Sequence, residues 1–153
     1  MAGIVEVATG DADVYEATAV VNGGDLVIPS GTAVNAGKQG IAQAGAGALN
    51  VLGVALKRAE PVANQNLTST DGDGYPVVYP NPVSELVTVV KARKVPVVYT
   101  ASAVAFGAKL KAAANGQVAA WVNGTDSAAA IIGECRVVGG MGAGGGVGLA
   151  YIY

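Results

Sequence analysis

The stretch VAFGAKLKAAANGQVAAWVNGTDSAAAIIGECRVV, residues 104–138, carries the pattern on which the fold depends. An apolar segment ends at Gly107, a strand centred on Leu110 follows, and an apolar strand containing Gly133 completes the unit. An Asn-Gly pair at residues 115–116 separates two of the strands, and such pairs are typical of tight turns. Short apolar segments bounded by turn residues predict β-strands, so this stretch predicts a small β module.

A shorter version of the same pattern occupies residues 20–57, where VVNGGDLVIPSGTAV is followed by a Gly/Ala-rich link and by NVLGVALK. Gly24, Leu26 and Gly53 correspond to the two glycines and the central leucine of the first stretch. The two glycines are 29 residues apart in this copy and 26 residues apart in the other. The sequence therefore indicates an internal repeat of two related β modules.

Prolines and glycines are spread through the chain, and no long stretch has the 3.6-residue period of an amphipathic helix. We therefore predict an all-β fold, a small β-barrel or sandwich, with an extended N-terminal arm or an edge strand over residues 1–16 and a single β domain over residues 17–153. Residues 64–82 contain three of the six prolines and predict a projecting loop or a small hairpin. The glycine-rich residues 139–146 predict a flexible link before a closing strand over residues 147–153.

The charge content of the chain indicates which kinds of partner to expect. Only 13% of the residues are charged, which is about half the usual share for a soluble domain. Such a surface is poorly protected against association, so we expect it to be buried in part against other chains. A compact and merely unpolar β domain is the alternative. The net charge is −2 and the pI is about 4.9, so no overall positive field attracts nucleic acid, and we expect no such partner.

The mean hydropathy of +0.45 raises the question of a membrane span. Residues 39–56 are uncharged, but they contain two glutamines, one asparagine and four glycines, which does not fit a transmembrane helix. The N-terminal residues show neither the basic region nor the apolar core of a signal peptide. We therefore expect a soluble protein with no membrane partner.

The residue types exclude several kinds of catalysis. The chain has no histidine, so Ser-His-Asp and Cys-His catalysis and histidine metal sites are excluded. Cys135 is the one cysteine, and its apolar strand predicts a buried small hydrophobe rather than a nucleophile. The eleven acidic residues fall mostly in turns, and no pair has the aromatic surroundings of a glycosidase acid and base. We predict that the protein is not an enzyme and has no catalytic residue and no cofactor.

Two motifs resemble ligand sites without completing them. Residues 69–74, STDGDG, match the first half of a calcium loop, but the twelfth position is Pro80, where a bidentate glutamate is needed. An acidic turn is therefore the preferred interpretation, and we predict no metal site. The glycine run over residues 139–146 lacks the GxxxxGK[ST] spacing of a phosphate-binding loop, so a link is preferred there.

The predicted loop combines prolines with tyrosines. Proline reduces the conformational entropy that a segment loses on docking, and tyrosine is enriched at protein interfaces. One hypothesis is a stiff hydrophobic contact patch, and a packed surface loop is an equally weighted alternative. The candidate contact residues in this loop are Tyr75, Pro76, Tyr79 and Pro80.

Five short motifs repeat through the chain: Gly24-Asp25-Leu26-Val27, Leu52-Gly53-Val54-Ala55, Gly107-Ala108-Lys109-Leu110, Ile132-Gly133-Glu134-Cys135 and the closing strand over residues 148–153. Together they resemble small phage head decoration proteins, or capsid cement proteins, and in particular phage proteins with a repeated Gly-Asp-hydrophobic and Gly-Val-Ala pattern. The likeness covers residues 15–153, while the loop over 64–82 and the glycine run depart from it.

This resemblance implies a homotrimer at threefold or quasi-threefold positions on the outer surface of the capsid, made in the host cytoplasm. Its implied partner is the major capsid protein, and by binding only the assembled lattice it would stabilise the capsid. We expect the N-terminal arm to lie along capsid subunits and to add a strand to one of them. The candidate contact residues of the arm are Ile4, Val5, Val7 and Tyr15.

Two other classes of protein share this composition. One is a different virion structural component, such as a head fibre base, a tail component or a minor capsid protein. The other is an enzyme or a carbohydrate-binding module that uses the acidic turns. One tryptophan and one phenylalanine are few for stacking against sugars, which disfavours the second class.

Overall fold

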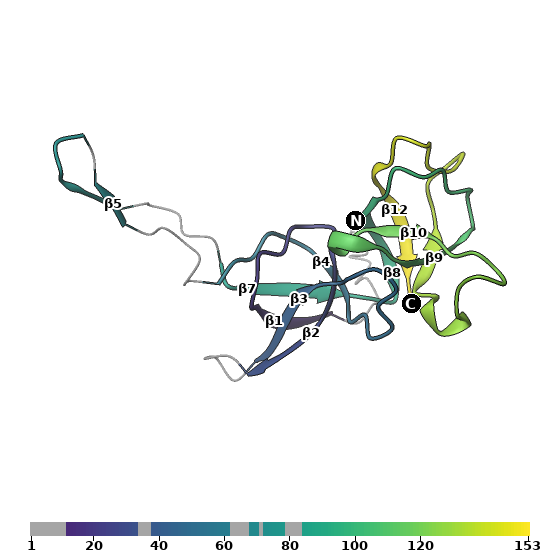
Figure 1. Ribbon diagram of the computed structural model, residues 1–153, viewed down its shortest axis with the longest axis horizontal. Helices are drawn as coiled ribbons and strands as arrows, with labels where there is room; N and C mark the ends of the chain where they lie inside the picture. The colour runs from purple at the N-terminus through teal and green to yellow at the C-terminus, as the bar shows by residue number, and fades with distance from the viewer. Residues whose placement is uncertain (1–11, 34–37, 62–67, 71, 79–83) are drawn as a thin grey trace, which may run out of the picture.

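The computed structural model describes residues 12–33, 38–61, 68–70, 72–78 and 84–153. This part of the chain forms two closed barrels of five strands each and one separate two-stranded sheet (Figure 1). The prediction of an all-β fold is therefore confirmed, and the sheets close into barrels. Among the residues with described positions, none forms a helix with the length and hydropathy needed to span a bilayer.

Barrel 1 is built from β1 (Ala12–Ala17), β2 (Leu26–Ala33), β3 (Gln39–Gln43), β4 (Gly53–Ala55) and β7 (Leu86–Val90). The spatial order of its strands is β1-β3-β2-β4-β7, and β7 pairs with β1 to close the barrel. β1 and β3 are parallel, and the other neighbouring pairs are antiparallel.

Barrel 2 is built from β8 (Arg93–Tyr99), β9 (Lys109–Ala112), β10 (Val118–Ala120), β11 (Gly133–Cys135) and β12 (Gly146–Ile152). Its spatial order is β8-β10-β9-β11-β12, and β12 pairs with β8 to close the barrel. Counted along the chain, both barrels have the order first, third, second, fourth, fifth, with the first and third strands parallel. Two short 3-10 helices, η2 (Ala114–Gly116) and η3 (Ala128–Ala130), lie in the connections of barrel 2.

Matching backbone hydrogen bonds relate the two barrels residue by residue. The N–H of Gly24 donates to the carbonyl of Ala55 at 2.8 Å. The N–H of Gly107 donates to the carbonyl of Cys135 at 2.9 Å. Further matching bonds are Val21–Ala59 with Val104–Met141, Leu52–Val27 with Ile132–Leu110, and Ala44–Leu26 with Trp121–Lys109. Each barrel contains one of the two segments, 20–57 and 104–138, from which the sequence indicates a repeat.

This register corrects one detail of the predicted repeat. Val27 pairs with Gly53, and Leu110 pairs with Gly133. Leu110 therefore corresponds to Val27 and not to Leu26. The difference matters because neighbouring residues of a strand point to opposite sides of the sheet. Val27 points into barrel 1, whereas Leu26 points away from it.

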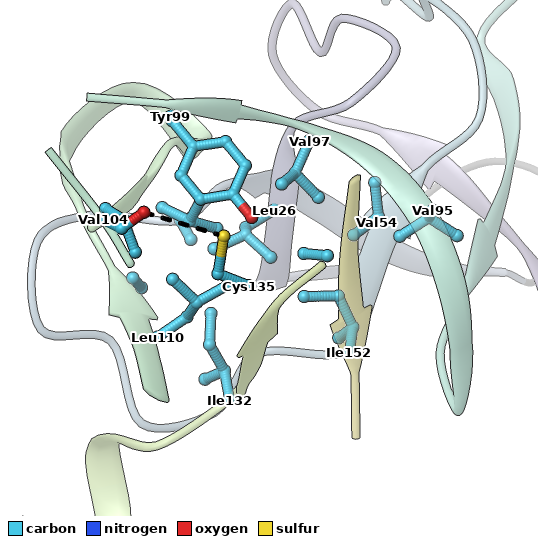
Figure 2. Packing of buried hydrophobic residues seen from close by; sticks show 14 of the residues in the cluster. Leu26, Val54, Val95, Val97, Tyr99, Val104, Leu110, Ile132, Cys135 and Ile152 are labelled. Atoms are coloured by element: carbon cyan, nitrogen blue, oxygen red, sulfur yellow. Dashed lines mark hydrogen bonds between the residues drawn. The ribbon is translucent and has the colours of Figure 1, made fainter. Parts of the chain in front are cut away.

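The two barrels have different cores. The interior of barrel 1 is a cluster of small and medium side chains: Ala17, Val21, Val27, Ile41, Ala55, Ala59, Val87 and Val89. The second cluster fills barrel 2 around Tyr99, Leu110 and Cys135, and it also includes four residues of barrel 1: Leu26, Ala44, Val54 and Val90 (Figure 2). The second cluster therefore joins the two barrels through apolar side chains.

Backbone hydrogen bonds also cross between the barrels. The N–H of Gly116 donates to the carbonyl of Ala44, and the N–H of Gly47 donates to the carbonyl of Ala112, both at 3.0 Å. A Cβ atom on Gly116 would lie 2.8 Å from the Cβ of Asp25, so only glycine allows this approach. At these two points the backbones of the barrels contact each other directly, in addition to the apolar side chains that join the barrels elsewhere.

Two predicted segments differ from the structure. Residues 12–16, which are predicted as part of an arm or an edge strand, belong to β1 of barrel 1, where Ala12–Ala17 pairs with β3 on one side and with β7 on the other. Residues 1–11 lie outside the described part. The glycine run is more than a link, because Met141 exchanges two backbone hydrogen bonds with Val104 and Gly146 already belongs to β12.

Candidate functional site

The candidate arm contact Tyr15 lies in β1 and is partly buried against the core of barrel 1. Its side chain packs on the core of the barrel, and its contact with a capsid stays a prediction. The other three candidates of the arm, Ile4, Val5 and Val7, lie outside the described residues. Tyr15 therefore lies in a barrel strand, where it forms part of the wall of a cavity described below.

Two of the candidate loop contacts, Tyr75 and Pro76, lie in a hairpin inserted between β4 and β7. β5 (Thr68–Thr70) and β6 (Pro76–Val78) pair antiparallel, and Pro76 is opposite Thr70. Tyr75 stands at the turn with 70% of its surface exposed. Figure 1 shows this hairpin apart from the two barrels. Tyr79 and Pro80 lie outside the described residues.

The buried reactive groups have structural roles. Cys135 is fully buried, and its thiol is directed at the carbonyl of Val104, with sulfur and oxygen 4.0 Å apart (Figure 2). The hydroxyl of Tyr99 donates to the carbonyl of Leu149 at 2.8 Å. Burial, followed by a hydrogen bond with Cys135, raises the pKa of Tyr99 well above its usual value. Within the described residues, no three acidic, cysteine or histidine side chains gather to hold a metal.

The surface that joins the barrels begins with three neighbouring residues on the outside of barrel 1. Val54 pairs with both Leu26 and Val90 on the adjacent strands. We call Leu26, Val54 and Val90 the outer row of barrel 1. All three are at most 1% exposed, because barrel 2 covers them. Burial of three such side chains is worth about 1.5–3 kcal/mol each, which makes this row the main apolar contact between the barrels.

The same positions in barrel 2 have a different chemistry. Glu134 pairs with Lys109 and with Tyr151, which correspond to Leu26 and Val90. We call Lys109, Glu134 and Tyr151 the outer row of barrel 2. The side chains of Lys109 and Glu134 are 44% and 19% exposed, and their charged atoms are 3.4 Å apart. Equivalent positions therefore differ in character: the outer row of barrel 1, which packs against barrel 2, is apolar, whereas the outer row of barrel 2 carries charges.

Each barrel also has an open end, which we call its mouth. In barrel 1 the mouth is a cavity of about 230 Å³ lined by Ala12, Asp13, Tyr15, Leu52, Val89 and Lys91. In barrel 2 the corresponding positions are Lys94, Val95, Val97, Ile132, Ala150 and Ile152. Five of these six belong to the cluster that receives the outer row of barrel 1, all except Lys94. The mouth of barrel 2 is thus filled, whereas the mouth of barrel 1 is a cavity as far as the described residues define it.

A polar network organises the loop between β10 and β11. Lys111 contacts both carboxylate oxygens of Asp126, at 2.7 and 2.8 Å. The N–H of Val122 donates to the same carboxylate at 2.7 Å, and the indole N–H of Trp121 donates to the carbonyl of Ser127 at 2.9 Å. The pKa of Asp126 is lowered, first by Lys111 and then by the Val122 N–H.

The outer rows and the mouths are not among the sites predicted from the sequence. A signal for the first outer row is present, because the β2 segment Leu26, Val27, Ile28 is apolar without alternation, which is typical of a strand covered on both faces. The equivalent segment of β9, Lys109, Leu110, Lys111, alternates, as expected of a strand with one face in water. The mouths have no comparable signal because their residues come from three separate strands.

Comparisons with known proteins find structures with a similar fold but no matching protein family. No protein-family model and no curated protein matches the chain. The N base of the head fibre gp8.5 of bacteriophage phi29 has a similar structure, with a TM-score of 0.59 and 14% identity over 94% of each chain. A C-terminal fragment of gene product 12 of the same phage aligns with a TM-score of 0.49 and 18% identity, over 93% of this chain and 99% of the fragment. The first similarity establishes a shared fold along nearly the whole chain.

Proposed function

We propose that this chain is a structural protein of a bacteriophage virion and that it forms the base of an appendage on the head surface. The observation that carries the proposal is the fold shared with a head fibre base over nearly the full length of both chains. The absence of histidine is consistent with a role that depends on surfaces rather than on catalysis.

This proposal modifies the function that the sequence resemblance implies. The resemblance implies capsid decoration, and the alternatives are another virion structural component, such as a head fibre base, a tail component or a minor capsid protein, or a carbohydrate-binding module. The structural similarity supports the alternative better, because the similar protein is described as a head fibre base. For either function we propose a location on the outer surface of the capsid, and we keep as proposed partners the major capsid protein and further copies of this chain in a homotrimer.

The hairpin is the proposed capsid contact. It interrupts the connection between the fourth and fifth strands of barrel 1, whereas barrel 2 makes the equivalent connection through residues 136–145 without a hairpin. A two-stranded hairpin is marginally stable by itself, so it gains stability when a partner pairs with it or covers it. Tyr75 at its turn supplies an exposed aromatic anchor. Pro76, Tyr79, Pro80 and the arm residues Ile4, Val5 and Val7 are proposed as further contacts.

The test is binding to heads that lack the protein, followed by cryo-EM to locate it. We expect density on the outer capsid surface and weaker binding of the Tyr75→Ala variant, because a buried aromatic anchor contributes about 2 kcal/mol or more at an interface. Val122→Ala, which truncates a residue that is 50% exposed on barrel 2, is the matched control. Density confined to the tail, or no binding to heads, would refute the head location. Equal binding of the two variants would refute the hairpin contact.

A further inference from the structure

The contact between the two barrels uses two different surfaces. Barrel 1 contributes its outer row, and barrel 2 contributes its mouth. Because the barrels share one topology, each barrel also carries the counterpart of the surface that the other barrel uses. The mouth of barrel 1 and the outer row of barrel 2 are these counterparts, and in the described part of the chain neither packs against the other barrel.

The mouth of barrel 1 has the form of a receptor for an outer row. Tyr15 and Leu52 give it an apolar wall that packs on the core, and Asp13 and Lys91 place opposite charges at its rim. In barrel 2, Val95 and Ile152 replace these two charged residues. The mouth of barrel 2 therefore suits an apolar outer row, and that of barrel 1 suits a row that carries charge.

The outer row of barrel 2 carries charge. Lys109 and Glu134 stand next to Tyr151, whose ring centroid is 6.1 Å from that of Tyr153. Glu134 is also paired with Arg136. Aromatic and arginine side chains are enriched in protein interfaces, and an aromatic ring beside charges matches a mouth with an apolar wall and a charged rim.

The charge distribution of the whole chain favours contact between opposite ends of two molecules. Residues 1–91, which include the rim residue Lys91, contain four basic and nine acidic side chains, whereas residues 92–153 contain five basic and two acidic ones. Barrel 1 of one copy and barrel 2 of another therefore attract each other, and two copies placed barrel 1 to barrel 1 repel.

We propose that a second copy of this chain docks the outer row of its barrel 2 into the mouth of barrel 1. The contact repeats between chains the arrangement that joins the barrels within one chain. Figure 2 shows Val54 near Val95 and Ile152, residues of the same cluster. The corresponding residues of the new contact are Glu134 of one copy and the rim residues Asp13 and Lys91 of the other. Glu134 and Lys91 then form an ion pair between the copies.

This inference rests on the self-association in the proposed function but not on its phage assignment. The contact is heterologous, so each copy offers one row and one mouth, and copies close into a ring or continue as a filament. In a ring of three, every row and every mouth would be occupied.

A charge exchange tests the docking in solution, without phage particles. The self-association of the full chain is measured by sedimentation velocity across a range of concentrations. We expect Lys91→Glu and Glu134→Lys each to weaken association about tenfold or more, because each places like charges at the contact. The combined variant with both changes restores the opposite charges and should associate like the unchanged chain.

Two exposed charges outside the contact serve as controls. Lys57→Glu and Asp73→Lys make the same kinds of charge change on exposed residues and should leave association unchanged. Thermal unfolding of each variant separates a folding defect from a docking defect, and the combined variant provides rescue if one single change destabilises barrel 2. A chain that stays monomeric at millimolar concentration, or single-variant losses that the combined variant does not restore, would overturn the proposal. Location on phage heads would be unaffected by either result.

Discussion

Single residues decide how closely the backbones of this protein approach each other. A Cβ atom on Gly53 would overlap the carbonyl oxygen of Val90, and one on Gly133 would overlap that of Tyr151. The two glycines are equivalent, so the same close approach occurs once in each barrel. Side-chain sizes also differ at equivalent positions of the two barrels, since barrel 2 has Tyr99 where barrel 1 has Ala17. The space for this larger ring comes from Gly148, which replaces the Val87 of barrel 1.

We expect Gly133→Ala to lower the free energy of unfolding by about 1–3 kcal/mol, the usual cost of forcing extra volume into a packed site. The neighbour that must move is a backbone carbonyl of β12, which cannot rotate away as a flexible side chain can. Gly142→Ala is the control, because no atom lies within 4 Å of its Cβ position and its φ is not positive. Urea unfolding of the two variants measures the difference, and equal stability would contradict the close-approach argument.

Single elements show how one barrel topology accommodates different loops. The fourth connection holds a hairpin in barrel 1 and a glycine-rich turn in barrel 2, and both barrels still close. The third connection of barrel 2, between β10 and β11, lacks regular strand pairing and depends instead on the ion pair of Lys111 with Asp126. Elements of this kind are held by side chains, so their stability follows the charge of those side chains.

The stability contributed by this loop should depend on pH. The pKa of Asp126 is lower in the folded chain than in the unfolded one, because Lys111 and the Val122 N–H favour the carboxylate. Such a group stabilises the fold above its unfolded pKa, near 4, and that contribution is lost as the pH falls through the lower folded pKa. Asp126→Asn keeps an acceptor for the Val122 N–H but removes the charge. Thermal unfolding should show the unchanged chain to be more stable than this variant near pH 6, with the difference shrinking below about pH 4. A difference independent of pH would contradict the ion-pair account.

At the scale of the whole molecule, the two barrels are joined by one apolar cluster that starts on the outside of barrel 1 and continues into barrel 2. The buried Asp25 stands beside this contact at 4% exposure. Its carboxylate accepts hydrogen bonds from the N–H of Asn22 at 2.7 Å and from the side-chain amide of Gln43 at 2.6 Å. The joint between the barrels is therefore closely packed, its buried carboxylate is hydrogen-bonded, and the two barrels should resist separation.

Placing the residue of barrel 2 at the same position of barrel 1 tests this joint. Val54→Glu buries a carboxylate among apolar side chains, and we expect it to cost roughly 3 kcal/mol or more. Val122→Glu adds the same carboxylate at an exposed site and should change stability by less than about 0.5 kcal/mol. Urea unfolding compares the two variants, and limited proteolysis between residues 90 and 93 reports whether the barrels separate. If both variants unfold alike, the outer row of barrel 1 is not the joint.

The sequence by itself determined the all-β class, the positions of the repeated glycines and the lack of histidine-dependent chemistry. These properties depend on residue type and on local spacing, because a turn glycine or a strand can be recognised from its neighbours. The sequence also indicated a repeat, although it aligned Leu110 with Leu26 instead of Val27, since two adjacent apolar residues hide which of them points inward.

Only the tertiary structure decided which surfaces face each other. The mouth of barrel 1 combines residues from the starts of β1 and β4 with residues at the end of β7, which are far apart in the chain. The exchange of Leu26, Val54 and Val90 for Lys109, Glu134 and Tyr151 becomes visible only when the two barrels are placed in register. The physical reason is that strand alternation distinguishes two sides of a sheet, whereas closure of the barrels and their docking decide what lies against each side.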